Sequence, residues 1–359
     1  MEKNSLNIVD LFCGCGGLSL GFLRAGFNIV LGVDIDKAAV RSFKENHPSS
    51  CVLCTDITTV QDQEILKIIG PKKIDLIIGG PPCQGLSLSG PRKMNDPRNG
   101  LFYSYVRMTK LLNPKAFVLE NVPGLLSLYK GQIKDAIFKE FQGLGYQISS
   151  QVLLAADFGV PQTRKRVFFV GTKSTSRQFK FPFPKHYPEG NLLGLPRYIT
   201  CEEAINDLPP LEYSIGESPS DYYLPPQNQF QEKMRECSPL LWNHVGTKHS
   251  DHVKQIISLV PDGGNYKDLP EELRKTRNFN IAWTRYHSKK PAYTIDTGHR
   301  HYFHYQYNRV PTVREHARLQ TFPDRFIFYG NKSEQNRQVG NAVPPLLAQA
   351  LAEELKKCL

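Results

Sequence analysis

The stretch "LNIVDLFCGCGGLSLGFLRAG", residues 6–26, places a strand, a glycine-rich turn and a helix in immediate succession. Residues 6–12 are mostly apolar, as in a buried strand, whereas residues 18–26 have helical spacing and end at Gly26. Glycines in the turn let the backbone approach a ligand closely where the helix begins. The stretch therefore predicts an α/β protein with a binding site after its first strand.

The same alternation continues to about residue 172. Strand-like runs such as "NIVLGVDI" (28–35), "KIDLIIGG" (73–80), "AFVLEN" (116–121) and "RKRVFFVGT" (164–172) alternate with helical patterns. This order predicts a mostly parallel sheet with helices on both faces. Residues 178–310 are rich in Pro, Tyr, His and Asn and show weak periodicity, so we expect a second, smaller and irregular domain there. The C-terminal helical pattern, in "PPLLAQALAEELKKCL", predicts a return to the first domain, which then comprises residues 1–177 and 311–359.

Composition limits the classes of partner. The 359 residues suffice for about two domains. The net charge of +11, from 45 Lys and Arg against 34 Asp and Glu, favours a polyanion, nucleic acid first. No signal-peptide pattern and no apolar run of roughly 20 residues is present, so we expect a cytoplasmic protein without disulfides. A metal is not expected, because Cys51 and Cys54 lack a second ligand pair and the His-rich "HRHYFH" has no acidic partner.

Acidic residues end two of the predicted strands. Asp34 stands about 20 residues after the glycine-rich turn, where a carboxylate can bind ribose hydroxyls. Asp56 ends the next strand-like run, where it could accept the exocyclic amine of adenine. The glycines do not follow the dinucleotide spacing G-x-G-x-x-G, since Ser19 occupies the third place. A nucleoside cofactor fits this pattern, although helix capping by these acids is an equally good interpretation.

Candidate catalytic residues follow the later strands. Cys83, in "GGPPCQGLS" (79–87), comes directly after a strand and between prolines and glycines that fix the chain direction. A thiol held at that edge is a candidate nucleophile, and a turn cysteine without a role is the alternative. Glu120 ends the following strand. Arg164 and Arg166 alternate in a predicted strand, so we expect both to point to one face; a solvated basic strand is the alternative.

Nine motifs in order resemble those of the cytosine-C5 DNA methyltransferases of bacterial restriction–modification systems. They are "DLFCGCGG", "GVDID", "CTDI", "GGPPCQGLSLSG", "DPRNGLFYSYV", "LENVPG", "PQTRKRVFFVG", "REHARLQTFPD" and "QVGNAVPP", and they span nearly the whole chain. The resemblance implies a Rossmann-like sheet that uses S-adenosylmethionine and releases S-adenosylhomocysteine. It also implies that residues 178–310 form a target recognition domain for double-stranded DNA.

The resemblance implies a role for each catalytic residue. The Cys83 thiolate adds to C6 of a flipped-out cytosine, so that C5 becomes able to accept a methyl group. Glu120 holds N3 and the exocyclic amine, and Arg166, helped by Arg164, lies around the cytosine carbonyl and Cys83. A base that the motifs do not identify then removes the C5 proton.

The resemblance also supplies two sets of binding residues. Those expected at the cofactor are Phe12, Gly14, Gly17, Asp34, Ile35, Asp56, Ile57, Pro82, Leu101, Asn341 and Val343. Asp34 departs from the family, which more often has glutamate there. Those expected at DNA are Ser87, Ser89, Arg92, Lys93 and Arg98, in a loop that closes over the substrate, and Thr294, Arg300 and Arg309 in the recognition domain.

Two other functions are compatible with these motifs. One is a tRNA cytosine-C5 methyltransferase of the same fold, although "PPCQGLSLSG" looks more like the DNA enzymes. The other is a catalytically inactive DNA-binding protein, against which the complete set of catalytic residues argues. We expect a monomer that needs no protein partner, makes no membrane contact and associates with the bacterial nucleoid through DNA.

Overall fold

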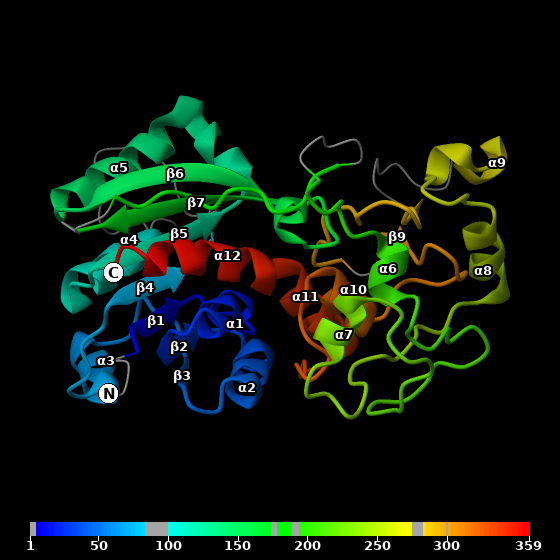
Figure 1. Cartoon of the computed structure of the whole chain (residues 1–359), viewed down its shortest axis with the longest axis horizontal. Coiled ribbons are helices and arrows are strands. Elements are labelled where there is room, and N and C mark those ends of the chain that lie inside the picture. Colours follow the sequence, from blue (N-terminus) through cyan, green and yellow to red (C-terminus); the bar gives the residue numbers. More distant parts are fainter. Residues whose placement is uncertain (1–4, 83–99, 174–177, 189–193, 275–282, 299–300) are drawn as a thin grey trace. The chain divides into compact units, whose positions relative to one another are not determined.

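The computed structural model describes the chain except for residues 1–4, 83–99, 174–177, 189–193, 275–282 and 299–300 (Figure 1). Two compact units account for the described residues. The first comprises residues 1–154, 165–183 and 345–359, and the second comprises residues 155–164 and 184–344. In the part of the chain that is described, no helix is long and apolar enough to cross a membrane.

A seven-stranded sheet, in the order β3-β2-β1-β4-β5-β7-β6, forms the centre of the first unit. Its parallel strands are β1 (Asn7–Leu11), β2 (Asn28–Asp34), β3 (Cys51–Cys54), β4 (Leu76–Gly79) and β5 (Ala116–Asn121). The last two strands, β6 (Gln147–Leu154) and β7 (Lys165–Thr172), are antiparallel to each other, and β7 is antiparallel to β5. The predicted mostly parallel α/β sheet is therefore confirmed.

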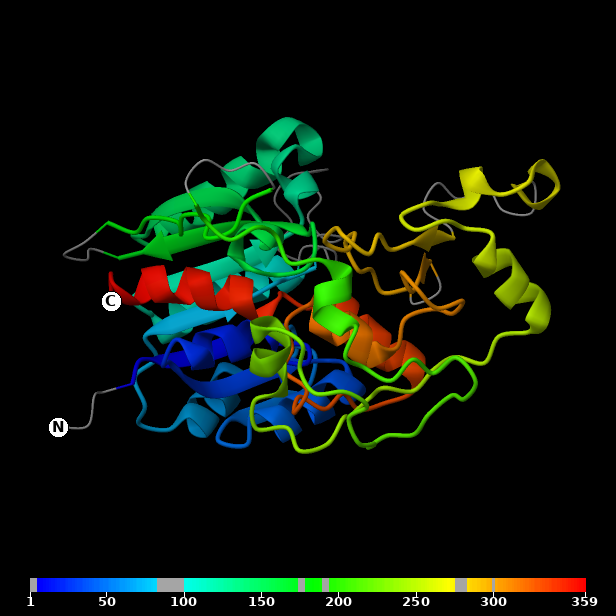
Figure 2. The same cartoon turned by 45° about the vertical axis from the view of Figure 1, so that its right-hand side comes forward.

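Helices cover both faces of this sheet (Figures 1 and 2). Apolar side chains from α3 (Asp62–Ile69), α4 (Gly100–Leu112) and α5 (Gln132–Gly143) pack with one face of the strands in a single buried core. On the other side lie α1 (Gly17–Arg24) and α12 (Pro345–Lys356), while α2 (Lys37–Asn46) connects β2 to β3. Strand order reverses between β1 and β4, and ligands of such sheets bind beyond the strand ends at that point.

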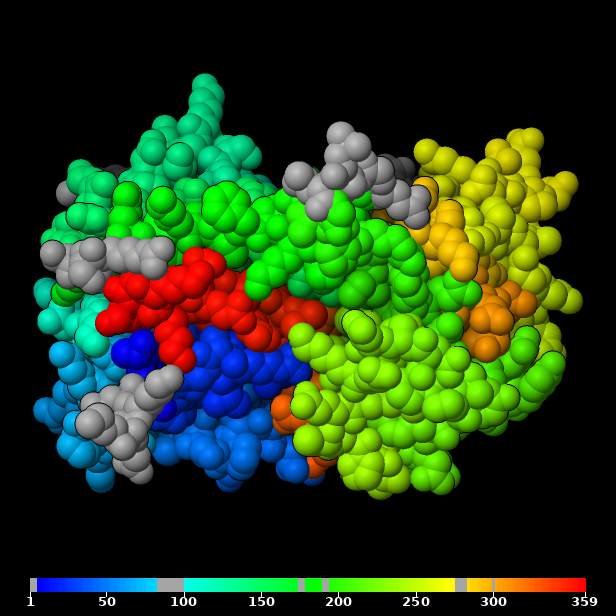
Figure 3. Space-filling model, in the orientation of Figure 1, coloured from blue at the N-terminus to red at the C-terminus, as the bar shows by residue number. Residues whose placement is uncertain are grey.

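The C-terminal helix α12 packs closely against α1, and the two surfaces adjoin in Figure 3. Gly21 permits this contact. A Cβ atom at Gly21 would overlap the Cβ of Ala348 and would lie 2.6 Å from both the amide nitrogen of Gln349 and the carbonyl oxygen of Pro345. Because two of these atoms belong to the backbone, a larger residue could be accommodated only if the helices moved apart.

Replacing Gly21 with alanine is therefore expected to destabilise the protein by about 1–3 kcal/mol, as overpacking does in other cores. Gly143, in α5, is the matched control because no atom lies within 4 Å of the Cβ position there. Urea denaturation of both variants checks this prediction. Gly143→Ala should unfold no earlier than the wild type, and equal midpoints for the two variants would contradict the packing argument.

The second unit has little regular structure. Its helices are short, and its paired strands β8 (Thr284–Arg285) and β9 (Tyr302–Phe303) have two residues each. The other elements among its described residues are the 3-10 helices η4 (Ala155–Phe158) and η5 (Tyr266–Asp268) and the helices α6 (Cys201–Ile205), α7 (Gln229–Arg235), α8 (Asp251–Ser258), α9 (Glu271–Arg274), α10 (Val313–Leu319) and α11 (Lys332–Asn341). The irregular middle of the sequence thus has an irregular fold.

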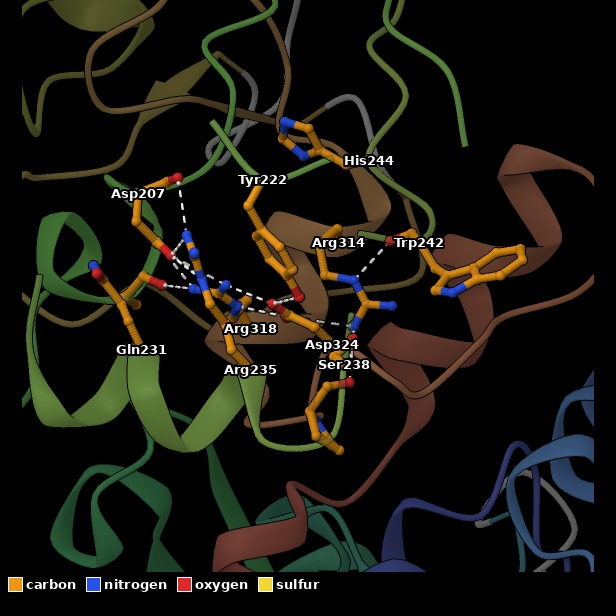
Figure 4. A network of polar contacts seen from close by, with 12 residues as sticks. Asp207, Tyr222, Gln231, Arg235, Ser238, Trp242, His244, Arg314, Arg318 and Asp324 are labelled. Carbon is orange, nitrogen blue, oxygen red and sulfur yellow. Dashed lines mark hydrogen bonds and ion pairs between the residues drawn. The ribbon is translucent and has the colours of Figure 1, made fainter. Parts of the chain in front are cut away.

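Helices α10 and α11 belong to this second unit, which differs from the expected boundary at residue 311. Buried charges explain the difference (Figure 4). The Arg318 guanidinium, on α10, binds the carboxylates of Asp207 at 2.9 Å and Asp324 at 2.6 Å. Burial opposes the charged form of Arg318, but the two carboxylates raise its pKa overall. Since an unpaired buried charge is costly, this ion-pair network ties α10 to the second unit.

Candidate active site

The chain leaves β4 through Gly80, Pro81 and Pro82, and residues 83–99, which begin at Cys83, lie outside the described part of the chain. The Asn121 side-chain amide, at the end of β5, donates a hydrogen bond of 2.9 Å to the buried Pro81 carbonyl. Parallel pairing of β4 with β5 brings these two strand ends together. The exit from β4 is therefore fixed by a neighbouring strand as well as by its prolines.

Glu120 and Arg166 form an ion pair at the same edge. The Arg166 Nε lies 2.8 Å from the Glu120 Oε1, and both side chains are largely buried, at 13% and 12% exposure. Burial lowers the pKa of Arg166, and the attraction of Glu120 opposes that shift. The pair arises because β5 and β7 are adjacent and antiparallel. It holds a carboxyl group and a guanidinium group in fixed positions where β4 ends.

Gly80 gives the Glu120 carboxylate its space. A Cβ atom at Gly80 would lie 2.6 Å from the Glu120 Oε2. The carboxylate cannot swing away freely, because Arg166 binds its other oxygen. The absence of a side chain at Gly80, the second glycine of "GGPPC", is thus explained by the carboxylate of Glu120, 40 positions later.

The family resemblance implies that the Glu120 carboxylate holds the cytosine, so Gly80→Ala, which displaces that carboxylate, is expected to lower kcat about tenfold. Gly124→Ala is its control, because no atom lies within 4 Å of the Cβ position at Gly124. Steady-state methylation of plasmid DNA compares the two variants. Equal rates for Gly80→Ala and the wild type would show that the carboxylate tolerates displacement.

Arg164 differs from Arg166 in its surroundings. Strand β7 begins at Lys165, so Arg164 precedes it and belongs to the second unit. Its guanidinium is fully buried and donates to the carbonyl oxygens of Ile295 at 2.9 Å and Gly340 at 2.8 Å. The expectation that both arginines point to one site is therefore corrected: Arg164 has carbonyl partners, and Arg166 has the carboxylate.

The glycine-rich turn is bound to the end of the neighbouring strand β2. The Asp34 Oδ2 accepts the Gly14 amide at 2.8 Å, and its Oδ1 accepts the Asp36 amide at 2.9 Å. Burial raises the pKa of Asp34, and these hydrogen bonds oppose the shift. Asp36, and not Asp34, caps α2 by accepting the amides of Ala38 and Ala39. Helix capping therefore does not account for Asp34.

Two further features fit a nucleoside ligand at this turn. Ile35, directly after Asp34 in the chain, is 68% exposed, so an apolar side chain is available to a ligand there. Gly16, the N-cap of α1, has φ of 95°, and a Cβ atom there would overlap the His47 Nε2. Beneath Gly16 lies the buried His47, whose Nε2 is 3.2 Å from the Gly16 carbonyl oxygen. His47 supports the glycine-rich turn and so belongs to this region, but it was not predicted from the sequence.

The remaining cofactor candidates of the first unit surround the same edge. Asp56 follows β3, and its Oδ1 accepts the amide and the hydroxyl of Thr58. The Ile57 side chain is buried in the core, so only its backbone is available to a ligand. Phe12 and Leu101 are partly buried against the same core. Gly17 is the first residue of α1.

The candidates in the second unit have different environments. Asn341 ends α11 and is exposed, Val343 is buried, and Thr294 is partly buried. Arg309 is 4% exposed, and Glu315 binds its guanidinium at 2.8 and 2.6 Å. The proposed DNA contact at Arg309 is therefore wrong: its charge is neutralised in the interior. Seven predicted residues lie outside the described residues: Cys83, Ser87, Ser89, Arg92, Lys93, Arg98 and Arg300.

The fold and the edge residues define an α/β protein with a glycine-rich turn and a carboxylate–guanidinium pair at the carboxyl ends of its parallel strands. Residues 6–357 match the model of the C-5 cytosine-specific DNA methylases. The chain belongs to this family.

Several known proteins are similar over nearly the whole chain. The type II methyltransferase M1.HphI of Haemophilus parahaemolyticus is 42% identical, over 98% of this chain and 87% of that protein. The type II methyltransferase M.DdeI of Desulfomicrobium norvegicum is 40% identical, over 98% and 88%. A crystal structure described as a DNA modification methyltransferase encoded within an E. coli prophage has a TM-score of 0.80 and 29% identity, and 99% of each chain is covered.

Proposed function

We propose that this DNA cytosine-5-methyltransferase acts on a cytosine flipped out of double-stranded DNA, through a covalent bond between Cys83 and C6. The observation that carries the proposal is the Glu120–Arg166 ion pair beside Gly80, Pro81 and Pro82. It puts a fixed carboxyl group next to the strand end from which Cys83 follows.

The chemistry distributes among these residues. The Cys83 sulfur attacks C6, and Glu120 stabilises the adduct by holding N3 and the exocyclic amine as charge develops. Arg166 fixes the orientation of the Glu120 carboxylate. After methylation of C5, loss of the C5 proton to a base allows the Cys83 sulfur to leave. Because the Glu120 and Arg166 side chains are largely buried, their electrostatic interaction is stronger than it would be in water.

S-adenosylmethionine, when bound, supplies the methyl group. We propose that Asp34 binds the ribose of the cofactor, that Ile35 packs against its adenine ring, and that Asp56 accepts a hydrogen bond from the exocyclic amine of the adenine. The fit rests on an acid that already orders the glycine-rich turn and on an exposed isoleucine beside it. Phe12, Gly14, Gly17, Ile57, Pro82, Leu101, Asn341 and Val343 complete the proposed cofactor site.

The biological role follows the named relatives. Both M1.HphI and M.DdeI are type II methyltransferases, so we propose that this enzyme protects bacterial DNA in a restriction–modification system, acting as a cytoplasmic monomer. Residues 178–310, most of which lie in the second unit, are then the target recognition domain. Thr294 and Arg300 are proposed DNA contacts there, as are Ser87, Ser89, Arg92, Lys93 and Arg98 in the segment after Cys83.

One experiment tests this function. The protein is incubated with labelled S-adenosylmethionine and either mixed-sequence duplex DNA or tRNA, and the modified cytosines are mapped. Label at C5 within one short DNA sequence is expected. Label in tRNA alone would replace the proposed substrate, and label in neither would contradict the assignment of an active enzyme.

A further inference from the structure

Arg107 connects helix α4 to the turn that follows β3. Its Nη2 donates to the Ile57 carbonyl oxygen at 2.8 Å, and its Nη1 donates to the Val60 carbonyl oxygen at 2.9 Å. The same Nη1 lies 3.1 Å from the Asp62 carboxylate at the start of α3. One planar guanidinium thus spans two carbonyl groups of the turn, which a lysine ammonium cannot do in the same geometry.

The turn bound by Arg107 carries Asp56. Locally it is held by the Asp56 carbonyl, which accepts the amide of Thr59 at 3.0 Å and its hydroxyl at 2.9 Å. Arg107 adds two hydrogen bonds from α4, and these fix the position of the turn relative to that helix. Because the Ile57 side chain is buried in the core, a ligand meets this turn through its backbone and through the Asp56 carboxylate.

We propose that Arg107 is a positioning residue for the adenine side of the cofactor site. It fixes the backbone of Ile57, and through it the Asp56 carboxylate, relative to the helix that carries Leu101. Arg107 itself need not touch the cofactor. This inference rests on the proposed S-adenosylmethionine site, and it adds a determinant of cofactor affinity and of base selectivity within that site.

Arg107→Lys and Asp62→Asn separate the carbonyl contacts from the ion pair. The lysine keeps a positive charge near Asp62 but loses the two-carbonyl fork, whereas Asp62→Asn removes the ion pair and leaves both carbonyl bonds. The expected result for Arg107→Lys is an increase of about tenfold in the Kd of S-adenosylhomocysteine and in the KM of S-adenosylmethionine. At saturating cofactor, kcat and the KM for DNA should remain unchanged. Asp62→Asn should bind both ligands as the wild type does.

A second ligand reports whether the loss arises at adenine. The S-inosyl analogue of homocysteine carries a carbonyl in place of the exocyclic amine, so it should bind the wild type more weakly than S-adenosylhomocysteine. Arg107→Lys should reduce this preference, because the Asp56 carboxylate is then no longer held in position to accept the exocyclic amine. A general loss of stability would weaken both ligands equally and would lower the melting temperature, which is measured in parallel.

The outcomes distinguish the two proposals. If the wild type fails to bind S-adenosylhomocysteine, the cofactor assignment itself is wrong. If the wild type binds it and Arg107→Lys matches Asp62→Asn in affinity and selectivity, only the positioning role is wrong; a lower kcat at saturation would also overturn it. Should Arg107→Lys not fold, Arg107→Gln, which retains one amide donor, is compared with Asp62→Asn by the same measurements.

Discussion

Cys83→Ala is expected to eliminate methyl transfer to DNA, with a loss of at least about 10⁴-fold in kcat, because no other group can form the C6 adduct that activates C5. The affinities for S-adenosylhomocysteine and for DNA should change little, since the thiol contributes to neither in the resting enzyme. Single-turnover methylation with labelled S-adenosylmethionine measures the loss.

Cys237→Ala is the matched control for this variant. Cys237 is an exposed thiol of the second unit, so its removal should leave the rate unchanged. Residual activity of Cys83→Ala within tenfold of that control would show that the nucleophile lies elsewhere.

Glu120→Gln is expected to lower kcat by about 10²- to 10³-fold, the range for loss of a preorganised charge or proton donor in an active site. Glutamine keeps the shape but cannot give a proton to N3 or balance the Arg166 charge. Removal of one partner from a largely buried ion pair also leaves the other uncompensated, so a loss of stability of a few kcal/mol is expected.

The rate and the stability are therefore measured together. Single-turnover rates are compared at a temperature well below the melting point of the variant, and Glu64→Gln, on the exposed surface of α3, serves as the control. A Glu120→Gln enzyme that is less stable but fully active at low temperature would reduce Glu120 to a structural role.

The fold could be predicted from local patterns because those patterns determine each element. A buried strand, positive-φ glycines and a helix follow one another in residues 6–26, and pairing of β1 with β2 and β4 then places the turn at the point where strand order reverses. The capping alternative for Asp34 was open in the sequence. Only the hydrogen bonds show that Asp36 is the cap.

The predictions from the sequence were wrong for two charged side chains, one with partners far away in the sequence and one with a partner only a few residues away. Arg164 bonds carbonyl groups 131 and 176 residues later, which no strand alternation can reveal. Arg309 lies among basic and aromatic residues typical of a DNA-binding surface, yet Glu315, six residues later, binds it in the interior. The role of Arg107 was not predicted for a related reason, because a helix pattern does not tell which arginine reaches two carbonyl groups of another turn.

Family resemblance supplied what single residues could not. Cys83 and Glu120 are separated by 36 positions, and their proposed association in one site rests on the pairing of β4 with β5 and on the ordered motifs. The pairing of Glu120 with Arg166 was not predicted from the sequence. The antiparallel pairing of β5 with β7 brings these two residues together, and the alternation of strands and helices does not specify that pairing.

The most direct test of the central claim uses duplex DNA that carries 5-fluorocytosine at the mapped target position. Fluorine at C5 prevents proton loss, so the adduct cannot resolve after methylation. The account predicts that the wild type with S-adenosylmethionine forms a covalent complex stable to denaturing electrophoresis, with the bond at Cys83 by peptide mass, and that Cys83→Ala forms none. A complex formed equally by Cys83→Ala, or none formed by an active wild type, would contradict it.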